Sequence, residues 1–198
     1  TAAKFNIDFP VGFKLISFPL VFTNEAKSDL DVLIGTQLTG GSVPGNADRV
    51  YSYQGGAWKQ AYLKTGTGWL GTLEKLTGDK AAWVLILDGH PAKSVTFAGL
   101  APTAGAGDIN LVTGFNFVGS VYPVAVDLDD SGLPAVLTSG DVPANADRVY
   151  SFQEGVWKQA YLKTGVGFVG TLTHLSPGRG YWIYKQGAPA TWYYSRPY

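Results

Sequence analysis

Hydrophobic and polar positions alternate with a period of two along much of the chain. In residues 4–9, Phe5, Ile7 and Phe9 fall on one face and polar side chains on the other. This is the pattern of a half-buried β-strand, because successive side chains of a strand point to opposite sides. Further apolar runs predict strands at residues 12–20, 82–87, 94–97, 109–111, 114–118, 181–184 and 192–194. The pattern therefore predicts a mainly β fold.

The strongest hairpin signal occurs twice, with an offset of 99 residues. Residues 47–66 and 146–165 are identical except at three pairs of positions, which are Tyr53 and Phe152, Gly55 and Glu154, and Ala57 and Val156. In the first copy Gly55-Gly56 separates two alternating segments, and glycine pairs are typical of hairpin turns. The self-similarity indicates a tandem duplication in which each copy is about one small domain long.

The repeat divides the chain into two homologous modules. We expect a β-sandwich-like or barrel-like module at residues 1–100, a linker at residues 101–105 and a second such module at residues 106–198. Each module should contain short helices. Ser28 is the expected N-cap and Asp31 the third position of a capping box in the first copy, and Pro134 suits a first helical turn in the second. The short linker predicts that the modules touch.

The repeated hairpin places aromatic side chains on one face. In its second strand Trp58 and Tyr62 alternate with Lys59 and Leu63. The favoured interpretation is that Trp58 and Trp157 are buried, because the cores of β domains need large aromatic residues. The alternative is an exposed face that stacks on sugar rings. Its candidate ligand-facing residues are Tyr51, Trp58, Tyr62, Tyr150, Trp157 and Tyr161.

Composition excludes several classes of partner. Lys plus Arg and Asp plus Glu both number 15, so the net charge is zero and gives no general attraction to nucleic acid or anionic lipid. No apolar run approaches the roughly 20 residues that span a bilayer. The chain has no cysteine and no methionine. We therefore expect that Thr1 follows either removal of an initiator methionine or cleavage of a signal peptide. The lack of oxidisable sulfur suits an extracellular protein.

The sequence contains no recognisable catalytic constellation. His90 and His174 do not occupy matching positions in the two copies, and the nucleophile pattern Gly-x-Ser-x-Gly does not occur. Nucleophiles and acid–base pairs with organised partners are the features that mark an active site. We therefore predict that the protein is not an enzyme.

One acidic segment resembles part of a metal-binding loop. Asp127, Asp129 and Asp130 precede Gly132 in a pattern that matches the first half of a calcium loop. Thr138 stands where such a loop needs a bidentate glutamate. The segment is a candidate calcium site, the alternative is a polar turn before a helix, and no other cofactor is expected.

Several short motifs point to a family setting. They are Gly-Phe-Asn-Phe-Val at 114–118, Asp-Arg-Val-Tyr-Ser-Phe at 147–152, Leu-Ser-Pro-Gly-Arg-Gly-Tyr-Trp-Ile at 175–183 and Gly-Phe-Lys-Leu-Ile-Ser-Phe-Pro at 12–19. Together they resemble β-rich modules of secreted and surface proteins of bacteria and archaea, which open with a Gly-Trp-Asn-Leu-Ile-Ser-like strand and close with a Pro-Gly-x-Gly-Tyr-Trp-Ile-like strand. The first copy departs from the closing motif at residues 78–84. The resemblance implies an extracellular or cell-surface location and supplies no catalytic residue.

The arrangement of the copies suggests a structural role. The chain ends carry the same strands that join copy one to copy two, so the end of one molecule could meet the start of the next in the same way. Such a contact is heterologous and builds a filament or surface layer unless the rotation closes a ring. The expected assembly strands contain Phe5, Ile7, Phe9, Trp192, Tyr193 and Tyr194, which would pair with another copy by strand addition.

We therefore expect a non-catalytic extracellular protein that assembles with itself. Two alternatives stay open. The terminal strands could pair within their own modules, or the protein could be a carbohydrate-binding or adhesive module whose partners are glycans.

Overall fold

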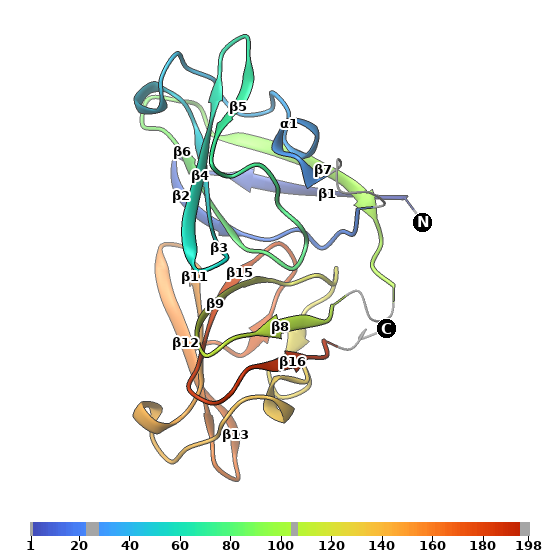
Figure 1. The fold of residues 1–198 in the computed structure, drawn as a ribbon, viewed down its shortest axis with the longest axis vertical. Coiled ribbons are helices and arrows are strands. Elements are labelled where there is room, and N and C mark those ends of the chain that lie inside the picture. Colours follow the sequence, from blue (N-terminus) through green and yellow to red (C-terminus); the bar gives the residue numbers. More distant parts are fainter. Residues whose placement is uncertain (1, 23–27, 104–106, 195–198) are drawn as a thin grey trace.

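The computed structural model describes residues 2–22, 28–103 and 107–194. The fold is mainly β and contains two five-stranded antiparallel sheets, one from each copy of the repeat (Figure 1). This confirms the predicted fold class. No helix among the described residues is long and apolar enough to cross a membrane.

The first module consists of a five-stranded sheet and a two-stranded ribbon. The sheet has the order β2-β6-β3-β4-β5 and the ribbon pairs β1 with β7. The bounds are β1 Ala2–Phe9, β2 Gly12–Ile16, β3 Arg49–Gln54, β4 Ala57–Lys64, β5 Gly68–Gly71, β6 Ala82–Ile86 and β7 Lys93–Leu100.

The second module repeats this plan strand for strand. Its sheet has the order β9-β15-β11-β12-β13, and its ribbon pairs β8 with β16. The bounds are β8 Ile109–Leu111, β9 Gly114–Gly119, β11 Arg148–Gln153, β12 Val156–Lys163, β13 Gly167–Gly170, β15 Gly180–Lys185 and β16 Ala190–Trp192. An additional short pair joins β10 (Val126–Asp127) to β14 (His174–Leu175).

The helices are short, as predicted, but one cap differs. They are α1 Leu30–Leu33 and the 3-10 turns η2 Pro44–Asn46, η3 Leu133–Ala135 and η4 Pro143–Asn145. Pro134 lies in the first turn of η3, as expected. The N-cap of α1 is Asp29 rather than Ser28, and it makes no side-chain capping bond. The Asp31 carboxylate instead accepts a bond from the Trp69 amide at 2.9 Å, so the predicted capping box is wrong.

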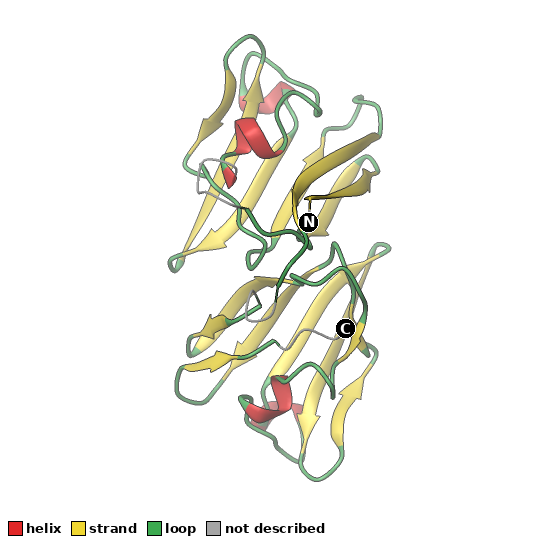
Figure 2. Cartoon of the chain, turned by 90° about the vertical axis from the view of Figure 1, so that its right-hand side faces the viewer, coloured by secondary structure: helices red, strands yellow, loops and turns green. Residues whose placement is uncertain are grey.

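The ribbon of each module covers one face of its sheet. In the first module the β1–β7 ribbon covers the inner face, where Ile7, Phe9 and Phe97 pack with Val50 and Val84 in one buried cluster (Figure 2). In the second module β8, β16 and the following residues fill the same place, and the large rings of Tyr122, Trp192 and Tyr194 are buried there. The result is a sandwich-like module with one covered and one open sheet face.

A buried aspartate begins each hairpin and fixes the loops around it. Asp48 is fully buried, accepts bonds from the amides of Thr39 at 2.8 Å and Leu87 at 2.9 Å, and contacts His90 Nδ1 at 2.7 Å. Asp147 plays the same part for Thr138 and Gln186. A buried carboxylate is tolerated because its oxygens are satisfied. The Asn-Ala-Asp segments therefore organise the fold, and His90 belongs to this network.

The two modules meet through a pseudo-two-fold contact. Ser17 N donates to Gly178 O at 3.2 Å, and the counterparts of these residues, Gly119 N and Asp79 O, form the same bond at 2.9 Å. Bridge-type pairing between Ile16 and Arg179 and between Lys80 and Val118 repeats the exchange. A contact in which each partner offers the same surface is isologous and closes on itself. The junction of the copies is therefore not the heterologous contact that the sequence argument assumed.

Candidate functional site: an aromatic groove across both modules

The open face of each sheet carries the aromatic side chains of the repeated hairpin. Val50, Ala61 and Leu63 point into the core and are buried, so the alternating positions, including Tyr51 and Trp58, point outward. Trp58 and Trp157 are each 54% exposed. The prediction that these two tryptophans are buried is wrong, because the ribbon of each module covers only the other face of the sheet.

Ten aromatic residues line a continuous surface that we call the aromatic groove. It contains two adjoining pockets of about 970 and 520 Å³, which share Trp58 and Trp157. The ten residues are Phe13, Tyr51, Tyr53, Trp58 and Trp83 from the first module and Phe115, Tyr150, Phe152, Trp157 and Trp182 from the second.

The hairpin of each module reaches across to the sheet of the other. Trp58 packs edge-on against Trp182 with ring centroids 5.7 Å apart, and its counterpart Trp157 packs against Trp83 at 6.0 Å. Edge-to-face packing is a favourable arrangement of aromatic rings. Beneath these rings, Leu15, Ala81 and Phe117 form a small buried cluster. The two-fold contact between the modules therefore also builds the floor of the groove.

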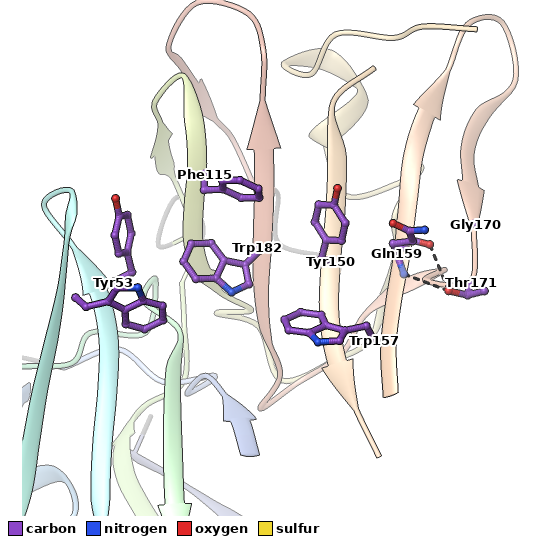
Figure 3. A pocket seen from close by; sticks show the side chains of 9 residues that line it. Tyr53, Phe115, Tyr150, Trp157, Gln159, Gly170, Thr171 and Trp182 are labelled. Carbon is purple, nitrogen blue, oxygen red and sulfur yellow. Dashed lines mark hydrogen bonds between the residues drawn. The ribbon is translucent and has the colours of Figure 1, made fainter. Parts of the chain in front are cut away.

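Polar side chains stand at the outer border of the groove. In the second module Gln159 and Thr171 line the larger pocket, and the backbone N–H of Gln159 donates to Thr171 Oγ1 at 3.1 Å (Figure 3). Gln60 and Thr72 make the equivalent bond at 3.2 Å in the first module. Among the described residues that line the two pockets, none carries a charge. The groove thus offers aromatic faces and neutral hydrogen-bonding groups.

Sequence reasoning identified part of this site. Of the six predicted ligand-facing aromatics, Tyr51, Trp58, Tyr150 and Trp157 line the groove. The other two, Tyr62 and Tyr161, lie half-buried on the same face of their strands but line neither pocket.

Six of the ten aromatic groove residues were not predicted from the sequence, and they are Phe13, Tyr53, Trp83, Phe115, Phe152 and Trp182. The available signal was the period-two position of each ring in its strand. In β6 and β15 this period-two signal is weak, because the side chains on both faces of those strands are apolar.

The predicted assembly strands lie inside their own modules. Strand β1 pairs with β7 along its whole length, and the side chains of Ile7 and Phe9 are buried. Strand β16 pairs with β8, and Trp192 and Tyr194 are buried while Tyr193 is 65% exposed. The alternative that the terminal strands pair within their modules is therefore the arrangement observed in the single chain.

The acidic segment is used for internal hydrogen bonds. Asp129 accepts a bond from the Phe168 amide at 2.8 Å, and Asp127 accepts one from the Asp129 amide at 3.2 Å. In the first module Asp31 makes the same bond to the Trp69 amide without any calcium-loop pattern. Across the described ranges, no group of three or more His, Cys, Asp or Glu side chains is placed to hold a metal ion. The arrangement matches the polar turn that was the alternative interpretation.

Comparison with known proteins finds no relative: no family model, no curated protein and no solved structure matches the chain.

Proposed function

We propose that the protein is a non-catalytic structural subunit of the cell surface that polymerises by exchanging strand β1 between neighbouring copies. The observation that carries the proposal is the position of β1, which supplies side chains to the core although only two residues connect it to β2. Strand β1 forms eight register pairs with β7, from Ala2 opposite Leu100 to Phe9 opposite Lys93. A neighbour's β1 could occupy the same place with the same contacts.

The connection after β1 suits such an exchange. Only Pro10 and Val11 separate β1 from β2, and both are exposed. Strand β1 belongs to the ribbon and β2 to the opposite sheet, so the chain changes layers within this short segment. Short hinges between such elements favour domain swapping. Opening at Pro10 would direct β1 away from its own module while leaving a vacant position along β7.

Exchange of β1 between molecules would supply a heterologous contact, which the junction between the two modules does not provide. The donor surface is β1 and the acceptor surface is β7, so the contact is heterologous and propagates unless a ring closes. Every hydrogen bond of the closed form is remade between molecules, so the net cost is mainly that of association. The extracellular setting is supported by the resemblance to secreted modules and by the absence of cysteine and methionine.

A pair of cysteines across the ribbon tests the proposal directly. The chain has no cysteine, so an introduced pair has no native cysteine to react with. Asn6 and Thr96 are opposite in register and exposed, and Gln37 binds the outward amide and carbonyl of Thr96. They are thus a non-hydrogen-bonded pair, whose Cα separation of about 4.5 Å suits a disulfide.

We expect oxidised Asn6→Cys/Thr96→Cys protein to give a ladder of covalent oligomers on a denaturing gel, which a reductant collapses to monomer. Mixing the two single variants should give a cross-linked dimer. The control pair Asn110→Cys/Thr191→Cys lies across β8 and β16. It should give only monomer with an intramolecular disulfide, because β8 is internal to the chain. Oxidised monomer alone from the first pair, under conditions where micrographs show large particles, would rule out exchange of β1.

A further inference from the structure

We propose that the aromatic groove binds an uncharged glycan chain that lies across both modules. This is a binding activity separate from polymerisation, and it does not rest on strand exchange.

The groove exposes four large aromatic side chains on one face. Phe13, Trp58, Phe115 and Trp157 are each more than half exposed, at 53, 54, 51 and 54%. They come from four strands, two in each module, and lie on one continuous face. Contiguous apolar patches of this kind mark interaction sites in soluble proteins.

The exposed rings are held in place by other rings. Phe13 packs edge-on against Trp83 at 6.1 Å, and its counterpart Phe115 packs edge-on against Trp182 at 5.8 Å. Trp58 is fixed by contacts with rings of both modules. Because the rings are fixed before a ligand arrives, little conformational entropy is lost on binding. This rigidity favours a ligand that stacks flat faces on preformed platforms.

The chemistry of the lining selects the class of ligand. With no charged side chain among the described residues that line the two pockets, the groove has no cation to pair with phosphate or carboxylate groups and no carboxylate to pair with an ammonium group. The Gln159 carboxamide can both donate and accept hydrogen bonds, which matches hydroxyl groups, and Figure 3 shows it beside Tyr150 and Trp157. A sugar ring combines an apolar face with a hydroxyl edge. The two pockets together exceed a typical single-ligand site, which favours a chain over one sugar unit.

The groove remains available in the proposed polymer. It lies on the outer face of each sheet, whereas the β1–β7 ribbon packs on the inner face. Exchange of β1 therefore leaves the groove open, and glycan binding should be equal in monomer and polymer. The two proposals can fail independently, because one is tested by cross-linking and the other by ligand titration.

Titration with neutral hexasaccharides tests the inference. The probes are hexamers of β-1,4-glucan, α-1,4-glucan, β-1,4-mannan and β-1,4-xylan, and the readouts are tryptophan fluorescence and calorimetry. We expect at least one probe to bind, and Trp157→Ala and Trp58→Ala each to weaken that binding by about tenfold or more. Phe115→Ala, which removes one ring from the larger pocket, should weaken it less.

The control variant is Tyr193→Ala, because Tyr193 is an exposed aromatic residue outside the groove. It should leave affinity unchanged, and thermal melts should show that every variant is folded. Failure of all the hexasaccharides to bind would overturn the proposal, as would binding that Trp58→Ala and Trp157→Ala leave intact. Tryptophan fluorescence that changes with protein concentration alone, lost in both variants, would instead assign the groove to a second copy of the chain.

Discussion

The two modules share their outer face and differ in the layer behind it. The hairpins that build the groove are nearly identical in sequence, and their strands have the same register in both copies. The ribbons differ, because β1 and β7 form eight pairs whereas β8 and β16 form three. The outer face of each sheet must fold within its own module and also fit the outer face of the other module across the two-fold contact, so two requirements constrain its sequence. The inner layer only has to fill a volume.

Different side chains fill that volume in the two modules. The first module uses Phe18 and Phe97, whose rings are 4.6 Å apart. The second stacks Trp192 on Tyr194 at 4.7 Å and adds Tyr122 edge-on at 4.9 Å. Cores tolerate such replacement when volume and pattern are kept. The comparison shows that a tryptophan's sequence context does not reveal its burial, since Trp157 and Trp192 belong to one module and lie in opposite environments.

The largest expected effect is a difference in the free energy of unfolding between alanine variants of these two tryptophans. Trp192→Ala should lower the free energy of unfolding by about 3–5 kcal/mol, because a fully buried ring is removed. It also removes the indole that donates to Ser131 O at 2.7 Å. Trp157→Ala should lower it by about 1 kcal/mol, since its ring is 54% exposed. Urea denaturation measures both, and equal losses would show that Trp157 is part of a core after all.

Alkaline pH should weaken the second module selectively. Burial raises the pKa of Tyr194 to about 12, and burial also raises the pKa of Tyr181. Both tyrosines have an ordinary pKa near 10 in the unfolded chain, so the folded state holds its protons longer. The associated stability is complete below pH 10 and is lost as the pH rises toward 12.

For Tyr194 the loss amounts to roughly 2 kcal/mol. Denaturation curves at increasing pH, read out by the near-ultraviolet signal of ionised tyrosine, measure it. Tyr194→Phe is the control and should have a flatter pH profile, because only Tyr181 then contributes. An unchanged profile in that variant would contradict the assignment to Tyr194.

The smallest effects are expected at the two aspartates that accept hydrogen bonds from the backbone amides of β5 and β13. Asp31→Ala and Asp129→Ala should each lower stability by about 1 kcal/mol, because each removes the acceptor of one backbone amide. We expect the same loss with and without EDTA in thermal melts. A bound calcium ion would appear as a chelator-dependent loss in wild type that Asp129→Ala abolishes and Asp31→Ala does not.

Much of the fold was predictable from local pattern. The duplicated hairpin, the strand β1 and the core strand β6 follow from alternation and turn residues, which act over a few positions. The cap of α1 was not predictable, because Asp31 bonds to Trp69 on a strand far along the chain. Pairing of β10 with β14 was missed for the same reason, since Asp127 meets His174 only after the module has closed.

The candidate site was predictable only in part. Alternation shows which side chains share a face, but β4 carries apolar residues on both, with Leu63 on one and Trp58 on the other. Which face becomes buried depends on where the ribbon packs. The cross-module contacts of Trp83 and Trp182 depend in addition on how the two modules dock, which no local pattern encodes.

The two-fold contact also makes the halves of the molecule complementary rather than interchangeable. Ala81 and Gly180 are counterparts, and a Cβ added to Gly180 would lie 2.8 Å from that of Ala81 and 2.8 Å from Ile16 O. Two first modules, each with alanine here, could not approach so closely. Duplication within one chain has therefore allowed a small residue to face a larger one, which discourages mispairing between the first modules of neighbouring chains. When copies of the protein associate through other surfaces, the two modules of each molecule can therefore stay paired with each other.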